Sequence, residues 1–412
     1  MLKSFAHIGV RQTKNIVKFV LGYPVSFPSL GSMTLDKDDV FIARNWLKDK
    51  SSWNDNTLVP EYEKKFAQWN GSKYAFAFMG GRVALSACIY ALGLKPGDEV
   101  IIPGYTCVVV PNAFQFAGIK PVYSDIELET YGLDASLLEE KITAKTNGIM
   151  LHHLYGLVCR DYEKIINIAQ KHGLKVIEDC AHSTGSKYKG IKVGNYGDVA
   201  FYSSEQSKIF TTIRGGMAVT NDHIIAQKIN MYYKQALVPD DIWIEKQLYN
   251  VILNYYAFKH PQKWWMGDIA RLKYGRKKLI STTYEEECGI QPVHYGRRMS
   301  DPIAAIGINQ IKKIDRYNAL RRENALRWDK WCGQNGYAKP LVITNSVPVY
   351  LRYPVMVEAE KKANMSWATR ELRLQIGVWF VSNIHPVDKV VNECPNADKA
   401  VKQCINFPGL LK

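Results

Sequence analysis

Short apolar runs alternate with amphipathic helical stretches along the chain from about Tyr74 to Thr220. The runs have the length of strands and are bounded by glycine, proline and polar residues. The predicted strands are Tyr74–Phe78, Glu99–Ile102, Ile119–Ser124, Gly148–His153, Lys175–Ile177, Val199–Phe201 and Met217–Thr220. The clearest helices between them are Val83–Leu92 and Tyr162–His172. This alternation predicts an α/β domain built on one mostly parallel sheet.

The pattern changes after Asn221, where a helical stretch leads into a basic, aromatic-rich segment. Isoleucines then recur at helical spacing from Ser300 to Ile314, in a helix that continues to Trp331. Beyond it we expect a small α+β domain, with strands at Val347–Val355 and Gly377–Val381 and a helix near Met365–Leu374. The predicted parts are a basic N-terminal arm (1–35), a large domain (36–299) with an insertion at 231–290, and an interdomain helix with a small domain (300–412).

Composition excludes several classes of protein. Hydrophobic residues make up 47% and charged residues 23% of the 412 positions, which excludes a disordered, collagenous or coiled-coil chain. The 8 cysteines form no CxxC pair, so we predict neither a disulfide framework nor a metal site. No apolar run is long enough to cross a bilayer and no secretion signal is recognisable, so we expect a cytoplasmic protein.

The net charge of +15 raises the question of an anionic partner. Basic residues gather in the N-terminal arm and in residues 231–280, but no DNA- or RNA-binding motif accompanies them, so we predict no nucleic-acid partner. An anionic, phosphate-bearing substrate fits the charge. Two interpretations of the aromatic, basic insertion stay open: a structural elaboration whose aromatics pack on the core, or peripheral contact with an anionic membrane.

Polar residues that follow predicted strands are the first candidates for chemistry, because ligands of α/β sheets bind beyond the carboxyl ends of the strands. Asp179 ends one strand, and His182 follows it by three residues. Ser203 lies in the hydroxyl-rich loop after the next strand, and Lys208 lies five residues further on. Gly80-Gly81-Arg82 lies between a strand and a helix, where free backbone N–H groups bind anions. Together these groups supply what pyridoxal 5′-phosphate (PLP) requires.

Each of three side chains has a defined role towards this cofactor. Lys208 would hold PLP as a Schiff base and, once displaced by an amine, transfer the proton at the substrate carbon. Asp179 would keep the pyridine nitrogen protonated, since a nearby carboxylate favours the cation. His182 would lie near the phenolic oxygen or over the ring. The phosphate would be bound by the amides around Gly81 and Arg82 and by the Ser203 hydroxyl.

At this point the sequence resembles the DegT-type sugar aminotransferases, which are fold-type I PLP enzymes. The resemblance runs from about Asp36 to the C-terminus. It is carried by Pro96–Pro103, Lys120–Ile126, His153–Gly156, Val176–Ser183, Gly215–Asp222, Arg298–Ser300 and Ala304–Gly307. It implies a large domain with a mostly parallel sheet, a smaller C-terminal α+β domain, and a homodimer with active sites shared at the interface. It also implies glutamate as the amino donor and a nucleotide-linked keto-sugar as the acceptor.

For individual residues, the resemblance implies that Lys208 is the Schiff-base lysine and that Asp179 is the partner of the pyridine nitrogen. His182 falls at a cofactor-contacting position. Gly81, Arg82 and Ser203 fall at phosphate-binding positions.

Several positions depart from the family pattern. Arg82 replaces a hydroxyl residue that contacts phosphate, and Cys107 replaces the aromatic residue that usually stacks on the cofactor. Ile213-Arg214 replaces a Gly-Glu pair, Gly296 replaces an interface asparagine, and the connection at residues 231–290 is longer than usual.

We therefore predict an aminotransferase that moves the amino group of L-glutamate onto a 3- or 4-keto-6-deoxy-hexose, for surface polysaccharide or natural-product sugars. A PLP-dependent sugar dehydratase and a non-catalytic, membrane-associated relative are the alternatives; Lys208 favours transamination, since the dehydratase branch carries histidine there. The sequence leaves the sugar and the nucleotide open. It also leaves open whether Arg352 and His385 contact the sugar or are a strand-surface residue and a turn residue.

Overall fold

The structure is a computed structural model that describes residues 13–14, 16–18, 20–21, 33–259, 282–374 and 376–411. Most of the predicted N-terminal arm lies outside the described residues. So do residues 260–281 of the predicted insertion, with Trp264 and Trp265.

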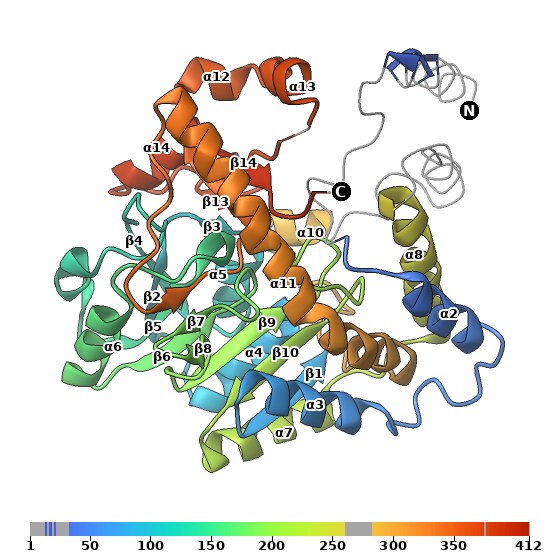
Figure 1. The fold of residues 1–412 in the computed structure, drawn as a ribbon. Helices are drawn as coiled ribbons and strands as arrows, with labels where there is room; N and C mark the ends of the chain where they lie inside the picture. The colour runs from blue at the N-terminus through green and yellow to red at the C-terminus, as the bar shows by residue number, and fades with distance from the viewer. Residues whose placement is uncertain are drawn as a thin grey trace.

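A seven-stranded sheet forms the centre of the molecule (Figure 1). Six of its strands run in the same direction, whereas β10 runs antiparallel to both of its neighbours. The order is β1 (Tyr74–Phe78), β10 (Gly216–Thr220), β9 (Val199–Ser203), β6 (Lys175–Asp179), β5 (Thr146–His152), β2 (Glu99–Pro103) and β4 (Lys120–Ser124). All seven predicted strands are present, so the predicted α/β fold with a mostly parallel sheet is confirmed.

Helices cover the sheet, which explains why its strands are apolar on both faces. Every residue of β2 and of β9 is buried. The covering helices are α3 (Val59–Asn70), α4 (Gly81–Leu92), α5 (Val109–Phe116), α6 (Tyr162–Lys171) and α7 (His223–Gln235). Short 3₁₀ turns occur at Ala135–Leu137, Glu139–Lys141 and Leu154–Gly156.

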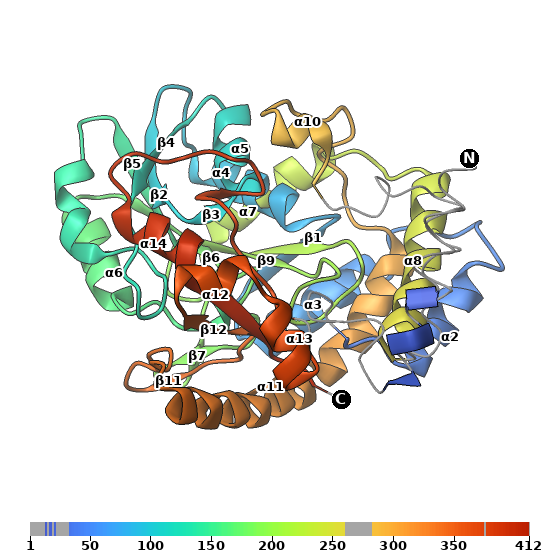
Figure 2. The same ribbon diagram turned by 90° about the horizontal axis from the view of Figure 1, so that it is seen from above.

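One long helix, α11 (Asp301–Asn335), joins two hydrophobic cores (Figure 2). It begins after Ser300 with a proline in its first turn, and it ends at Gly336, whose φ of 74° is left-handed. Its N-terminal half contributes Ile303 to the core around the large sheet. Its C-terminal half contributes Trp328 to a second core. The predicted helix is therefore confirmed.

The second core is completed by the C-terminal elements. The strand pair β12 (Arg352–Met356) and β14 (Cys404–Pro408) is antiparallel. Around it lie α12 (Ala359–Ala363), α13 (Ser366–Leu372) and α14 (Pro395–Gln403). Small pairings add β3 (Thr106–Cys107) to β13 (Ile384–His385), and β7 (Lys187–Tyr188) to β8 (Ile191–Lys192) and β11 (Ser346–Val347).

Two predicted C-terminal strands need correction. The prediction of one strand over Val347–Val355 is wrong, because residues 348–351 between β11 and β12 belong to no strand. Tyr350, which lies there, has a left-handed φ of 47°. The prediction of a strand over Gly377–Val381 is also wrong, since only Gly377 pairs, with Asn406. The next amides bind side chains instead of a strand: Trp379 N–H donates to Asn406 Oδ1 and Phe380 N–H donates to Tyr105 Oη.

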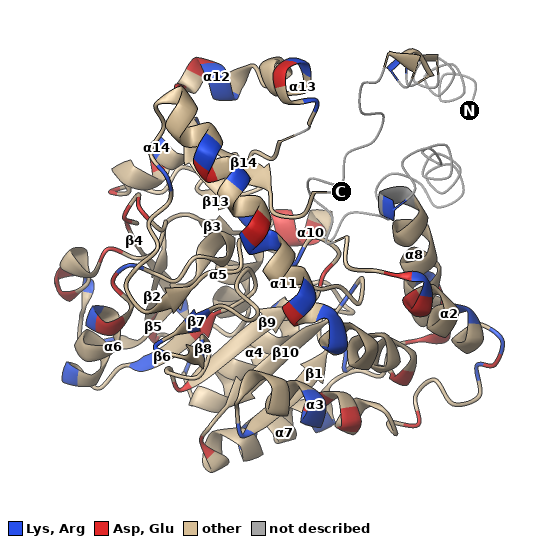
Figure 3. Ribbon diagram, in the orientation of Figure 1, with Lys and Arg blue, Asp and Glu red and all other residues tan. Residues whose placement is uncertain are grey.

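The described part of the insertion is helical. Helix α8 (Asp241–Lys259) lies beside α2 (Lys37–Trp46), and the one-turn α10 (Tyr284–Glu287) follows residues 260–281 (Figure 2). Tyr255 of α8 is buried in the main core, which supports the structural interpretation of the insertion for its described aromatics. The positions of Lys, Arg, Asp and Glu lie mainly on the outer helices and in loops (Figure 3). Within the described residues, no helix combines the length and the hydropathy needed to cross a membrane.

Candidate active site

A cleft of about 1110 Å³ opens at the carboxyl ends of the parallel strands. Its walls come from the β1–α4 junction, the ends of β6 and β9, the loop before β10, residues 282–297 and residues 379–386. All seven site residues predicted from the sequence line this cleft, namely Gly81, Arg82, Cys107, Asp179, His182, Ser203 and Lys208. Segments far apart in the chain therefore meet at one place, as the strand-end argument requires.

Asp179 is the last residue of β6, and it lines the cleft. The Ala181 N–H donates to Asp179 Oδ1 at 2.9 Å. Burial raises the pKa of Asp179 to about 6, although this hydrogen bond and the charge of Lys208 oppose the shift. A cationic nitrogen placed beside the carboxylate would restore its usual acidity.

Lys208 lies in the loop between β9 and β10, and its N–H donates to the Glu205 carbonyl at 2.9 Å. Its Nζ lies 5.2 Å from the centre of the Trp379 ring. Burial lowers the pKa of Lys208, and the charge of Arg352 adds to this effect, whereas Glu205 and Asp179 oppose it. The lowered pKa enlarges the fraction of neutral amine, which is the nucleophilic form.

His182 stacks on Trp379 with ring centres 5.1 Å apart and an interplanar angle of 11°. Burial and the nearby charges of Lys208 and Arg352 hold the pKa of His182 well below its usual value, so the ring is neutral. Because the Tyr155 N–H donates to Nδ1 at 3.4 Å, the ring proton is assigned to Nε2. His182 is thus a hydrogen-bond donor in the cleft.

The N-terminus of α4 is the candidate cradle for an anion. Gly81 starts the helix, and a Cβ there would lie 2.9 Å from Ser203 Cβ, so a glycine is needed for this close approach. The Arg82 guanidinium forms an ion pair with Glu286 of α10, whose side chain is buried. Backbone amides of a helix N-terminus and a hydroxyl fit a phosphate group, whereas the charge of Arg82 is already paired with that of Glu286.

These residues fit PLP. The buried carboxylate of Asp179, the amine of Lys208 and the cradle at α4 share one cleft that is large enough for the cofactor and a second molecule. The donor set offers a partner for the pyridine nitrogen, a covalent anchor and a phosphate site. Cys107 lines the same cleft, and burial raises the pKa of its thiol.

The sequence did not single out Trp379 or Glu286, although both line the cleft. For Arg352, the interpretation as a strand-surface residue is wrong, because only 1% of it is exposed. Its Cζ lies 3.6 Å from the centre of the Trp379 ring. His385 lines the cleft and stacks on Phe380. No local sequence signal marks Arg352 or Trp379, because their partners are remote in the chain.

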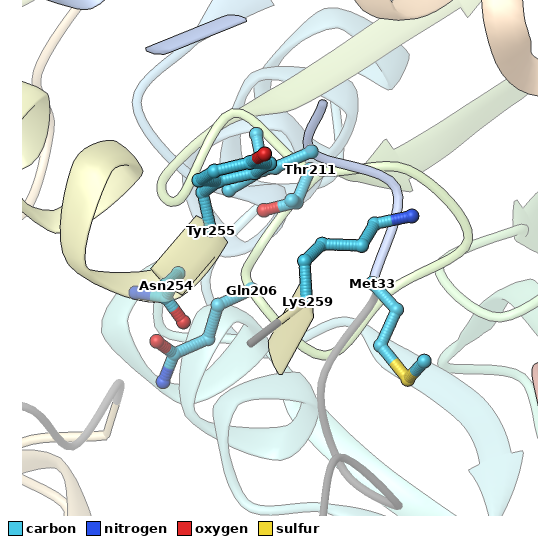
Figure 4. Close-up of a pocket in the computed structure, with 7 residues that line it drawn as sticks. Met33, Gln206, Thr211, Asn254, Tyr255 and Lys259 are labelled. Carbon is cyan, nitrogen blue, oxygen red and sulfur yellow. The ribbon is translucent and has the colours of Figure 1, made fainter. Parts of the chain in front are cut away.

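Helix α8 lies behind the loop that carries Lys208. A small cavity of about 10 Å³ separates the N-terminal segment, this loop and α8, and is lined by Met33, Gln206, Thr211, Asn254 and Tyr255 among others (Figure 4). On another side of the loop, Arg321 of α11 donates to the Ile209 carbonyl at 2.6 Å. The loop that carries Lys208 is therefore held by α11 through this hydrogen bond.

Comparison with known proteins finds one matching family. The sequence profile of the DegT/DnrJ/EryC1/StrS aminotransferase family matches residues 36–411. The GDP-perosamine synthase of Escherichia coli O157:H7 is 37% identical over 302 residues, which cover 73% of this chain and 69% of that protein. The UDP-2-acetamido-2-deoxy-3-oxo-D-glucuronate aminotransferase of Pseudomonas aeruginosa is 30% identical over 352 residues, or 85% of each chain.

The fold is shared with solved structures. NtdA of Bacillus subtilis, crystallised with bound pyridoxamine 5′-phosphate (PMP), superposes with a TM-score of 0.69 at 23% identity. The match covers 91% of this chain and 78% of NtdA. This likeness confirms the fold that the strand pattern predicts.

Proposed function

Because the chain belongs to the DegT/DnrJ/EryC1/StrS aminotransferase family of PLP-dependent sugar aminotransferases, we propose that it transfers the amino group of L-glutamate to a nucleotide-linked keto-sugar. The proposed acceptor is a 3- or 4-keto-6-deoxy-hexose, for surface polysaccharide or natural-product sugars. The names of the GDP-perosamine synthase and the 3-oxo-glucuronate aminotransferase support the substrate class. The observation that carries the proposal is the convergence of Asp179, Lys208 and the α4 cradle in one cleft.

The chain's own residues divide the work of the reaction. PLP, when bound, withdraws electrons from the carbon that carries the amino group. Asp179 would hold a proton on the pyridine nitrogen, and the resulting ion pair would lower the raised pKa of its carboxyl. Lys208 would anchor the cofactor and later carry the proton between the substrate carbon and the cofactor, since its lowered pKa favours the neutral amine.

The remaining residues would orient the cofactor. His182, neutral and protonated on Nε2, would donate to the phenolic oxygen. The amides at Gly81 and Arg82 and the Ser203 hydroxyl would bind the phosphate. Cys107 would contact the cofactor as a small side chain where relatives carry an aromatic ring.

We also propose that the chain acts as a homodimer with shared active sites. Ile290 and Val293 support this, because they are 58% and 88% exposed and yet lie in the wall of the cleft. A second copy would bury these apolar side chains beside the site. Light scattering of the purified holoenzyme would then give twice the chain mass of 46.9 kDa, and Val293→Glu would shift the protein towards the monomer. A wild-type monomer would contradict the proposal.

The test of the proposed function is the visible absorbance spectrum of the PLP-loaded protein before and after L-glutamate, compared with Lys208→Ala. We expect wild-type PLP to convert to PMP, and a nucleotide-linked keto-sugar to return it to PLP. Lys208→Ala is expected to lower the rate by at least about 10³-fold, because proton transfer loses its base. PLP binding without a glutamate response would contradict the donor, and the dehydratase alternative would gain support.

A further inference from the structure

Arg352 is a buried cation whose N–H donors have no acceptor. It is 1% exposed, and within the described chain none of Nε, Nη1 and Nη2 has a hydrogen-bond partner. Native proteins pair buried guanidinium groups, because an unpaired buried charge is costly. Proteins retain such an unpaired buried charge at functional sites, where a ligand supplies the missing partner.

Arg321 shows what a structural buried arginine looks like in the same protein. It is also 1% exposed, but it donates to the Asn318 side chain and to the Ile209 carbonyl. The difference between the two residues is therefore the missing acceptor, and not the depth of burial.

The guanidinium of Arg352 lies next to the reacting groups. Trp379, which lines the cleft, contacts both Arg352 Cζ at 3.6 Å and Lys208 Nζ at 5.2 Å from its ring centre. The charge of Arg352 also acts on His182 and His385, two further residues of the cleft wall. The Trp379 ring thus contacts both the amine of Lys208, which would react with the cofactor, and the guanidinium of Arg352, which has no acceptor.

No carboxylate of the protein fills this role among the described residues. Glu205 is the acidic residue whose charge reaches Arg352, but its Oε2 accepts from the N–H and the hydroxyl of Ser207. The position of Arg352 also depends on Gly377, since a Cβ at 377 would lie 2.4 Å from Nη1. The planar guanidinium, whose three nitrogens have no acceptor, matches the two oxygens of a carboxylate.

We propose that Arg352 binds a carboxylate of one of the two reactants during catalysis. Two sources share this chemistry: the α-carboxylate of the amino donor and the carboxylate of an acidic sugar. The inference rests on the proposed function for the identity of the reactants. The phosphate of the cofactor is not the anion in question, because its proposed cradle is at Gly81 and Ser203, at the start of α4, whereas Arg352 packs on Trp379.

The first experiment compares the thermal stability of the ligand-free protein with that of Arg352→Met and Arg321→Met. We expect Arg352→Met to keep or raise the melting temperature, because it removes an unpaired buried charge. Arg321→Met should lower the melting temperature by several degrees, because it breaks two hydrogen bonds. A comparable loss in both variants would overturn the proposal, since Arg352 would then be structural.

The second experiment measures ligand binding by thermal shift of the PLP-loaded protein. One arm adds 2-oxoglutarate, and the other compares UDP-glucuronic acid with UDP-glucose. At least one of the two carboxylate ligands should raise the melting temperature of the wild type but not that of Arg352→Met. UDP-glucose serves as the neutral control. Loss in the first arm assigns the donor, and loss in the second assigns the sugar. Equal shifts in wild type and variant would overturn the proposal.

Gly377→Ala provides a variant that keeps the arginine but displaces it. We expect it to weaken the same carboxylate by at least about 30-fold, the size found when a buried charge pair loses a partner, and Arg352→Lys to recover part of the affinity. Unchanged affinity in Gly377→Ala would contradict the assigned position of Nη1. Failure of glutamate to yield PMP in the wild type would count against the proposed function alone, because the thermal shifts do not depend on turnover.

Discussion

At the scale of single residues, the candidate site contains buried groups whose charged forms are destabilised while no ligand is bound. Asp179 carries a carboxylate whose pKa is raised, Lys208 an amine whose pKa is lowered, and Arg352 a guanidinium without an acceptor. Burial causes the two pKa shifts, whereas the third effect is the lack of an acceptor around Arg352. Groups perturbed in this way, gathered in one cleft, are typical of sites whose partners arrive with the ligand.

Asp179→Asn tests this for the cofactor-free protein. The folded pKa of about 6 exceeds the reference value of 3.8. The folded state therefore binds the proton more tightly, and unfolding free energy falls as the pH rises from about 4 to 6. Asparagine carries no charge, so it avoids the free-energy cost of a buried ionised carboxylate. Its side-chain oxygen can still accept from the Ala181 N–H. We expect a gain of about 2 kcal/mol at pH 8 that disappears below about pH 4.

Urea unfolding of the wild type and of Asp179→Asn at both pH values measures this difference. With PLP bound, the same variant should lose most of its transaminase activity, because the pyridine nitrogen loses its partner. A stability loss at pH 8 would show that the ionised carboxylate is not the strained form.

At the scale of elements, glycines decide how closely the chain segments around the site approach. Gly216 begins β10 where that strand passes the β1–α4 turn, and a Cβ there would lie 2.4 Å from the backbone carbon and oxygen of Gly80. Backbone atoms cannot rotate away as a side-chain end can. Gly333 is the opposite case, because it lies within α11 and a Cβ there would have no neighbouring atom within 4 Å among the described residues.

Gly216→Ala and Gly333→Ala form a matched pair. We expect Gly216→Ala to destabilise the protein by about 3 kcal/mol or more and to weaken PLP binding, because the cradle at Gly81 must shift. Gly333→Ala should stabilise the protein by up to about 1 kcal/mol through helix propensity alone. Chemical denaturation and PLP titration measure both effects. A small loss of stability and of PLP affinity in Gly216→Ala would mean that the β1–α4 turn can shift at little cost in free energy.

The sequence also predicted most elements of the large sheet. Its strands are continuous apolar runs, and such runs identify themselves when both faces of a sheet are covered. The C-terminal segments gave a weaker signal. At Gly377–Val381 the apolar pattern is present, but Trp379 and Phe380 donate to side chains of Asn406 and Tyr105, which no local pattern indicates.

At the scale of the whole molecule, α11 connects two cores, and the cleft lies where they meet. Trp53 is buried in the core of the large sheet, whereas Trp328 is buried in the second core, where it stacks on Phe407 at 4.4 Å and donates to the Pro408 carbonyl. The predicted division into residues 36–299 and 300–412 remains a prediction, and these two tryptophans test it.

Trp328→Ala is expected to cost about 3–5 kcal/mol of stability. If the second core is a separate unit, amide hydrogen exchange should accelerate in β12 and β14 and stay slow in β2 and β5. Trp53→Ala, the control, should accelerate exchange in the large sheet. Equal acceleration in both cores by either variant would show a single cooperative unit and contradict the predicted domain boundary.

The sequence by itself determined the α/β fold, the parallel strands, and Asp179, His182 and Lys208 as candidate site residues. The reason is that buried strands are apolar over their whole length and that each of these polar residues lies at a strand end or within five residues after one. Only the tertiary structure decided that Arg82 pairs with Glu286 and that Trp379 covers Arg352 beside Lys208. These contacts join residues far apart in the chain, and whether a buried charge finds an acceptor depends on every segment packed around it.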